Sequence, residues 1–233
     1  HPYTDAFNAD LGGNAYGGDY IVDLAVRFHE LDGLKWVDST EDERMADFRE
    51  RGYQMMLESI RQTCCCIHHA ADLTDRVTIH PGFLSPVGKL VPEKVWEMQK
   101  TALVEIGKHA EDHGVLACVE NMISIKDFLC RYPEEILGLT EGIAGIGVTL
   151  DIGHANTNGL VDAFLAHVGE VNHLHIHDNH GQSDEHLALG DGTINWEKVG
   201  RAVARDYSGP VVIEGRTLEE AGRSLAVFRK WFV

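Results

Sequence analysis

Short apolar runs alternate with amphipathic stretches from Arg76 onward, with a period of about 30 to 40 residues. Five of these runs are nearly continuous in apolar and β-branched residues, which is typical of strands covered on both faces. They are residues 76–80, 115–120, 147–152, 171–178 and 210–214. Strands that alternate regularly with helices predict a parallel sheet with right-handed crossovers.

The stretches between the runs carry helix start and stop signals. Pro92 suits a first helical turn, and Gly114 is a natural stop for the helix that follows it. We expect the later helices to start at or near Ser124, Trp196 and Thr217, and the last helix to end near Trp231.

Upstream, Thr40-Glu41-Asp42-Glu43 has the spacing of a capping box and predicts the start of a long helix that passes through Cys64. A strand should precede that helix. Residues 21–29 are the candidate, although their apolar spacing fits a helix equally well. Counting this strand gives six βα units, whereas a closed barrel has eight. We therefore expect a TIM-type (β/α) barrel, complete or lacking its first one or two βα units. It would form a single domain over residues 1–233, with residues 1–20 irregular.

Composition limits the class of protein. The chain is 44% hydrophobic and 24% charged, and no apolar run approaches the roughly 20 residues that span a bilayer. We expect a cytoplasmic location. Twenty basic against 37 acidic residues give a net charge of −17, which disfavours a broad surface for nucleic acid. Five cysteines, three of them contiguous at 64–66, do not form a disulfide framework and are expected to be reduced.

Metal-capable side chains are dense between residues 151 and 186. In His173-Leu174-His175-Ile176-His177, strand geometry predicts three histidines on one face. Further carboxylates and imidazoles lie close by in sequence, namely Asp151, His154, Asp184 and His186. Imidazole is the commonest metal ligand at neutral pH, so a metal enzyme is the first hypothesis.

Polar residues also end the apolar runs: His80, Glu120, Asp151, His175 and Glu214. In parallel α/β barrels the C-terminal ends of the strands carry the active site. A buried carboxylate without a partner is costly, so these carboxylates require a cation or a network of donors. The oxygen and nitrogen donors suit Mn²⁺, Co²⁺, Mg²⁺ or Zn²⁺, and the lack of thiolates argues against a structural zinc site.

Six motifs in this order resemble the xylose-isomerase-like TIM barrels, which include sugar isomerases and epimerases and the endonuclease IV group of abasic-site nucleases. The motifs are Ile79-His80-Pro81-Gly82, Val119-Glu120-Asn121, Leu150-Asp151-Ile152-Gly153-His154-Ala155, residues 173–178, residues 184–192 and Val212-Ile213-Glu214. The resemblance covers residues 76–233 well and 21–75 loosely.

The epimerase branch of the resemblance implies one divalent ion held by Glu120, Asp151, His175 and Glu214. It implies no organic cofactor. His154, His80 and His177 are expected to contact a small sugar or sugar phosphate. Glu120 and Glu214 would then remove and return a proton through an enediolate, as general base and acid of an isomerase or epimerase.

The endonuclease branch implies a trinuclear zinc phosphodiesterase that acts on abasic DNA. It would recruit additional ligands: His29, His80, His154, Asp184 and His186. A third alternative is an inactive barrel that serves as a binding module. We rank the isomerase first because the acidic chain lacks an arginine-rich loop for phosphate, and we leave a homo-oligomer open.

Two further histidine pairs stand outside this set. His68 and His69 are expected in or just after the long helix, as surface or packing residues. His109 and His113 are four apart, a spacing that can bind zinc, but they fall near a helix C-terminus, where the helix dipole itself favours histidine. We assign neither pair to the site.

Overall fold

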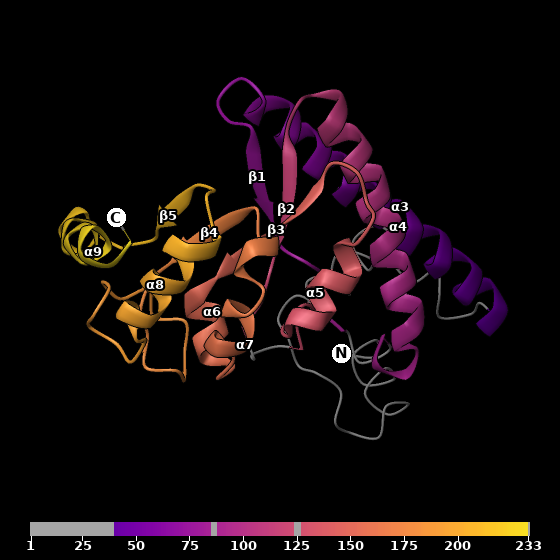
Figure 1. Ribbon diagram of the computed structural model, residues 1–233. Coiled ribbons are helices and arrows are strands. Elements are labelled where there is room, and N and C mark those ends of the chain that lie inside the picture. The colour runs from indigo at the N-terminus through magenta and orange to yellow at the C-terminus, as the bar shows by residue number, and fades with distance from the viewer. Residues whose placement is uncertain (1–39, 85–87, 124–126, 233) are drawn as a thin grey trace. The chain divides into compact units, whose positions relative to one another are not determined.

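The computed structural model describes residues 40–84, 88–123 and 127–232. In this part of the chain five parallel strands form one sheet in the order β1-β2-β3-β4-β5 (Figure 1). They are β1 (Arg76–Ile79), β2 (Leu116–Glu120), β3 (Ile146–Asp151), β4 (His173–Ile176) and β5 (Val211–Ile213). The five predicted strands are confirmed, with ends that move by one or two residues.

The sheet is strongly curled, as in part of a barrel. Four consecutive strands of a flat sheet would place β1 and β4 about 14 Å apart. Instead, the Thr78 hydroxyl oxygen of β1 lies 3.3 Å from Nδ1 of His173 and 3.4 Å from Nε2 of His175, both on β4. Side chains on the inner face of the sheet therefore meet one another.

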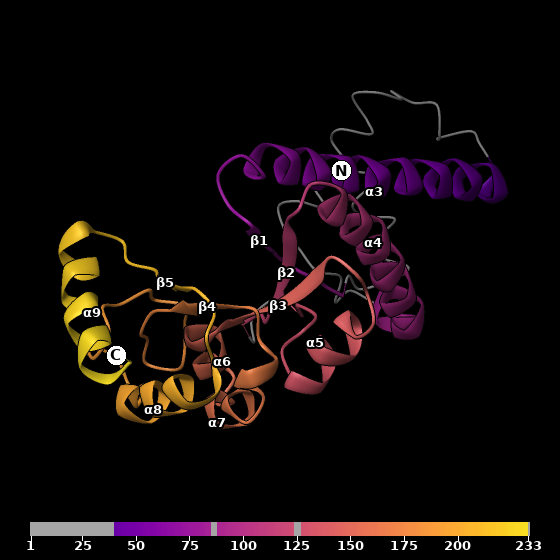
Figure 2. The same ribbon diagram turned by 45° about the horizontal axis from the view of Figure 1, so that its top comes forward.

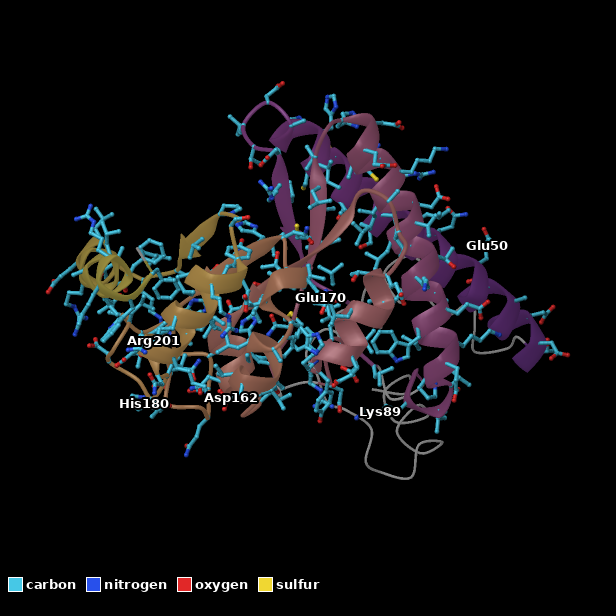
Figure 3. The ribbon with its side chains drawn as sticks, in the orientation of Figure 1. Glu50, Lys89, Asp162, Glu170, His180 and Arg201 are labelled. Atoms are coloured by element: carbon cyan, nitrogen blue, oxygen red, sulfur yellow. The ribbon has the colours of Figure 1, made fainter. Side chains whose placement is uncertain are left out.

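Helices cover the outer face of this sheet (Figure 2). They are α4 (Pro92–Asp112), α5 (Pro133–Thr140), α6 (Ile152–Thr157), α7 (Val161–Leu165), α8 (Trp196–Asp206) and α9 (Leu218–Trp231), with 3-10 turns η1 (Gly88–Leu90) and η2 (Val168–Glu170). Exposed charged side chains such as Asp162 and Arg201 point outward (Figure 3). None of the described helices combines the length and apolar character that a membrane crossing requires.

Most helix boundaries follow the predicted signals. Pro92 occupies the first turn of α4, and Gly114 follows that helix with a φ of 67°, the left-handed region that favours glycine. A capping box of Thr217 and Glu220 precedes α9, which ends at Trp231 as predicted. The helix after β2 is different. It begins at Pro133, later than the predicted start near Ser124, which itself lies outside the described residues.

The chain divides into two compact units, residues 1–59 and 60–233, and α3 (Glu41–Ala70) belongs partly to each. The predicted capping box at the start of α3 is confirmed, because the Glu43 backbone N–H donates to the Thr40 hydroxyl and the Thr40 N–H donates to the Glu43 carboxylate. The predicted strand at 21–29, the irregular first 20 residues and His29 all lie outside the described residues.

Residues of β3 alternate between two environments. Val148 and Leu150 belong to the hydrophobic core between sheet and helices. Thr149 and Asp151 are equally buried but polar. Successive strand residues point to opposite faces, so the polar set lies on the inner face of the curled sheet. The fold thereby gathers buried polar groups on one side, where only each other, or a bound ion, can satisfy them.

Candidate metal and active site

Carboxylates and imidazoles converge at the C-terminal edge of the sheet. Glu120 ends β2, Glu214 directly follows β5, and His175 lies on β4 between them. Nδ1 of His175 is 2.8 Å from Oε1 of Glu120 and 3.1 Å from Oε1 of Glu214. The β3–β4 register pairs Asp151 with His175 and brings Asp151 to the same edge. Parallel strands in register therefore bring these four side chains together.

His80 follows β1 and extends this group toward solvent. Its Nε2 lies 3.0 Å from Oε2 of Glu120. The Glu120 side chain is only 3% exposed, whereas that of His80 is 66% exposed. His80 thus connects a buried carboxylate to the outside.

A second group lies beside the first and centres on Asp184. Oδ1 of Asp184 is 3.3 Å from Nε2 of His177, and its Oδ2 is 3.1 Å from Nε2 of His186 and 3.5 Å from Nε2 of His154. The rings of His177 and His186 stack with centroids 4.0 Å apart. His186 also reaches Glu214, with Nδ1 3.5 Å from Oε2, so the two groups are continuous.

A buried carboxylate holds the loop that supplies Asp184 and His186. Asp178 lies just after β4 and accepts four hydrogen bonds, from the backbone N–H groups of Asn179, Gly190 and Ile194 and from the Trp196 indole. Its own backbone exchanges two hydrogen bonds with Leu187. The motif around residues 173–178 predicted no role for Asp178, because a scaffold residue and a site residue look alike in sequence.

Asn121 supports Asp151 and His154 in a similar way. Its side-chain oxygen accepts from the Asp151 N–H, and its side-chain N–H donates to the Asp151 carbonyl. Its backbone carbonyl lies 2.8 Å from Nδ1 of His154. A carbonyl can only accept, so Nδ1 of His154 carries a proton, and Nε2 faces the Asp184 carboxylate.

The charges of the first group stabilise one another. Burial alone would raise the pKa of the Glu120 carboxyl, but its contacts with His175 and His80 outweigh burial and lower that pKa to about 2. Burial likewise opposes a charge on His175, yet Glu120 and Glu214 raise its pKa to about 10. The carboxylates of Glu120 and Glu214 are therefore ionised, and their negative charges require a positive charge between them.

The charges of the second group, around Asp184, also stabilise one another. Burial disfavours a charged His154, but Asp151 and Asp184 raise its pKa to about 10. Burial of Asp184 is similarly outweighed by His154 and His186, which hold the pKa of that carboxyl well below its usual range. The imidazoles act as the counter-charges that the buried carboxylates require.

The donor atoms fit a bound cation better than they fit one another. Within these two groups, four buried atoms lack a hydrogen-bond partner among the described residues: Asp151 Oδ2, His175 Nδ1, His177 Nε2 and Asp184 Oδ1. For His175 and His177 a carboxylate oxygen lies within hydrogen-bond distance of the ring nitrogen, but the angle at the contact does not allow a hydrogen bond. In the part of the chain that the structure describes, three sets offer ligand atoms within 4.8 Å of one another: Glu120, Asp151 and His175; Asp151, His154 and His177; and His177, Asp184 and His186. Such nitrogen and oxygen sets suit divalent metals.

The structure brings together every predicted site residue that it describes. These are His80, Glu120, Asp151, His154, His175, His177, Asp184, His186 and Glu214. Of the three histidines predicted on one face, His173 and His175 lie on β4 and both contact Thr78, whereas His177 follows the strand, which ends at Ile176. His177 lies fully buried within two of the candidate ligand sets, although we predicted only substrate contact for it.

Comparison with known proteins agrees with this architecture. The model of the xylose isomerase-like TIM barrel family matches residues 48–231. The chain belongs to this family. Both the resemblance drawn from the six motifs and the predicted barrel-type fold are confirmed.

Two relatives of this xylose isomerase-like barrel come from Methanocaldococcus jannaschii. The uncharacterized protein MJ1311 is 31% identical over 194 residues, which cover 80% of this chain and 65% of that protein. The uncharacterized protein MJ1614 is 33% identical over 156 residues, which cover 66% of this chain and 59% of that protein. The chain thus spans about 60 to 65% of the length of these relatives.

Solved structures show the same fold. A D-tagatose 3-epimerase-like protein superposes with a TM-score of 0.68 at 28% identity, covering 82% of this chain and 71% of its own. The IolI protein, in a structure with a bound zinc atom, gives a TM-score of 0.65 at 19% identity and covers 78% and 72%.

Proposed function

We propose that the chain is a divalent-metal-dependent isomerase or epimerase that acts on a small sugar or sugar phosphate. The observation that carries this proposal is the pair Glu120 and Glu214, two carboxylates from different strands that flank one nitrogen of His175. Proton transfer next to a carbonyl requires a general base and a general acid near the reacting carbon, and two carboxylates placed in this way can serve as both. The likeness to a D-tagatose 3-epimerase-like protein supports a sugar as the substrate.

Glu120, Asp151, His175 and Glu214 would hold the ion. A divalent ion there would polarise a substrate carbonyl and stabilise the negative charge that develops on its oxygen. The alternative ions remain Mn²⁺, Co²⁺, Mg²⁺ and Zn²⁺, because this donor set suits each of them.

The two glutamates have unequal access to a substrate. Glu214 is 28% exposed, and its pKa is lowered, first by the contact with His175. It is therefore an ionised, accessible base for the proton on the carbon next to the carbonyl. Glu120 is buried, but His80 lies against it and reaches solvent. Protons held at Glu120 and His80 can exchange with water before one is returned to the substrate.

Deuterium uptake tests the proposal. Incubation with a panel of tetroses to hexoses and their phosphates in D₂O should place deuterium next to the carbonyl of a true substrate. Glu120→Gln and Glu214→Gln keep the shape but remove the base, so each should lower the exchange rate by about 10²-fold or more. His167→Ala, an exposed histidine paired with Glu170, is the matched control and should exchange like the parent chain. Absence of exchange across the panel with metal-loaded chain would refute an isomerase.

A second candidate function is hydrolysis of phosphodiesters in abasic DNA by several zinc ions. The group of His177, Asp184 and His186 favours it, because one ion at Glu120 and His175 leaves that group unused. Several neighbouring ions could generate hydroxide and stabilise a leaving oxygen. This function predicts incision of abasic duplex that weakens steeply with salt. The net charge of −17 keeps it second.

A further inference from the structure

Four histidines meet at the C-terminal ends of α3 and α4, which lie near each other in Figures 1 and 2. We call them the helix-end histidines: His68, His69, His109 and His113. The ring centroids of His68 and His113 are 5.0 Å apart, and those of His109 and His113 are 4.2 Å apart. The two histidine pairs that looked unrelated in sequence are therefore one cluster in space.

This cluster is separate from the strand-end site. The C-terminus of α4 leads directly into the start of β2, whereas Glu120 stands at the end of β2. The helix-end histidines thus lie at the N-terminal edge of the sheet, opposite the edge that carries the candidate active site. None of the contacts of the active-site network involves them.

Backbone carbonyls determine which ring nitrogen carries the hydrogen in three of these histidines. Nε2 of His109 lies 2.9 Å from the carbonyl oxygen of Cys64, Nδ1 of His113 lies 2.8 Å from that of His109, and Nδ1 of His69 lies 2.7 Å from that of Cys65. A carbonyl can only accept, so each of these nitrogens carries the proton. The other nitrogen of each neutral ring then holds a free lone pair, which is the arrangement that orients metal-binding histidines.

Electrostatics also favours one shared cation. Both helices present their negative dipole ends here, and the last turns of helices attract positive charge. Protonating every ring would place several like charges about 5 Å apart, which is unfavourable. A single divalent ion supplies the positive charge without that repulsion.

We propose that His68, His109 and His113 bind one divalent transition-metal ion at this helix end. His109 lies in the last turn of α4 and His113 is the C-cap residue four positions later, a spacing that can place two imidazoles on one ion. In the structure these three rings are not among the sets whose ligand atoms lie within 4.8 Å of one another. Nitrogens bound to one tetrahedral ion lie about 3.3 Å apart, so binding requires His68, which is exposed on α3, to turn its ring toward the pair. Because all ligands are imidazoles, the site takes Ni²⁺, Cu²⁺ or Zn²⁺ and not Mg²⁺ or Mn²⁺.

Ni²⁺ binding to the full, untagged chain tests this site. After removal of metal with a chelator, equilibrium dialysis should give one Ni²⁺ fewer per chain for His113→Ala and for His68→Ala than for the parent. The exposed His68→Ala variant guards against loss of folding, which circular dichroism checks. His167→Ala is the control and should keep the full Ni²⁺ content. On immobilised Ni²⁺, the parent should also be retained more strongly than either variant, because an exposed site can reach the resin.

Mn²⁺ separates this site from the candidate active site. His68→Ala and His113→Ala should each bind as much Mn²⁺ as the parent, because the carboxylates at the strand ends bind Mn²⁺ and imidazoles alone do not. Equal Ni²⁺ content in His68→Ala, His113→Ala and the parent would overturn the proposal. So would an equal loss of Mn²⁺ and Ni²⁺ in His68→Ala, because the effect would then act through the active site.

Discussion

Replacing Asp178 by Asn tests whether one buried carboxylate holds the loop of the second ligand group. The Asp178 side chain is fully buried and accepts four hydrogen bonds. Oδ1 serves the N–H groups of Asn179 and Ile194, and Oδ2 serves the Gly190 N–H and the Trp196 indole. Asn keeps the volume of the side chain but exchanges one acceptor oxygen for an NH₂ group.

The geometry sets the size of the effect. Whichever way the amide lies, two buried donors lose their acceptor and face another donor. A hydrogen bond to a charged group contributes about 1.5–3 kcal/mol, so losing two should cost about 3–6 kcal/mol of unfolding free energy. The released loop carries Asp184 and His186, so metal should be lost at that group before it is lost at Glu120 and His175.

Urea unfolding followed by circular dichroism measures this cost. Asp191→Asn is the matched control, because it makes the same chemical change in the same segment. Asp191 pairs with Arg223 at the surface, where water screens the two charges, so this variant should unfold like the parent. If Asp178→Asn unfolds within about 1 kcal/mol of the parent and binds the same number of ions, Asp178 is not the anchor of this loop.

Two further predictions concern the same site. A Cβ on Gly153 would overlap the buried ring of His177, so Gly153→Ala should cost about 1–3 kcal/mol of unfolding free energy in urea and lower the metal content. Gly138→Ala in α5 is the control, because a Cβ there meets no neighbouring atom and the change should be neutral or stabilising. Equal stability of the two variants would contradict this packing. In the metal-free chain the pKa values of His154 and His175 are raised to about 10, so both rings are protonated at pH 8. An ion that binds His175 should release about one proton, a second ion that binds His154 should release about one more, and binding should tighten as pH rises. Calorimetry in buffers of different ionisation enthalpy counts these protons, and release of none would show that the rings are not ligands.

The unfolding free energy of the metal-free chain should follow the same pKa values. A raised imidazole pKa contributes stability that is complete below about pH 6.5 and is lost as pH rises through about 10. The lowered pKa of Glu120 contributes stability that is present above about pH 4.5 and is lost as pH falls through about 2.

Local patterns in the sequence determined most of the fold and the members of the candidate site. Continuous apolar runs ending in His80, Glu120, Asp151 or Glu214 predicted strands and their chemistry together, because parallel strands place their C-terminal ends at one edge. Thr40 and Glu43 predicted the start of α3, since a capping box involves only four neighbouring residues. Such short-range signals can be recognised from the local sequence alone.

Tertiary structure alone decided the contacts between distant segments. The place of His177 among Asp151, Asp184 and His186 depends on where β4 ends and on how Asp178 ties down the following loop. The approach of His68 to His113 depends on the packing of the last turns of α3 against the end of α4, which brings residues 45 positions apart into ring contact. Strand alternation and helix periodicity specify which way a side chain points but not which distant side chain it meets. That is set by packing across the whole core.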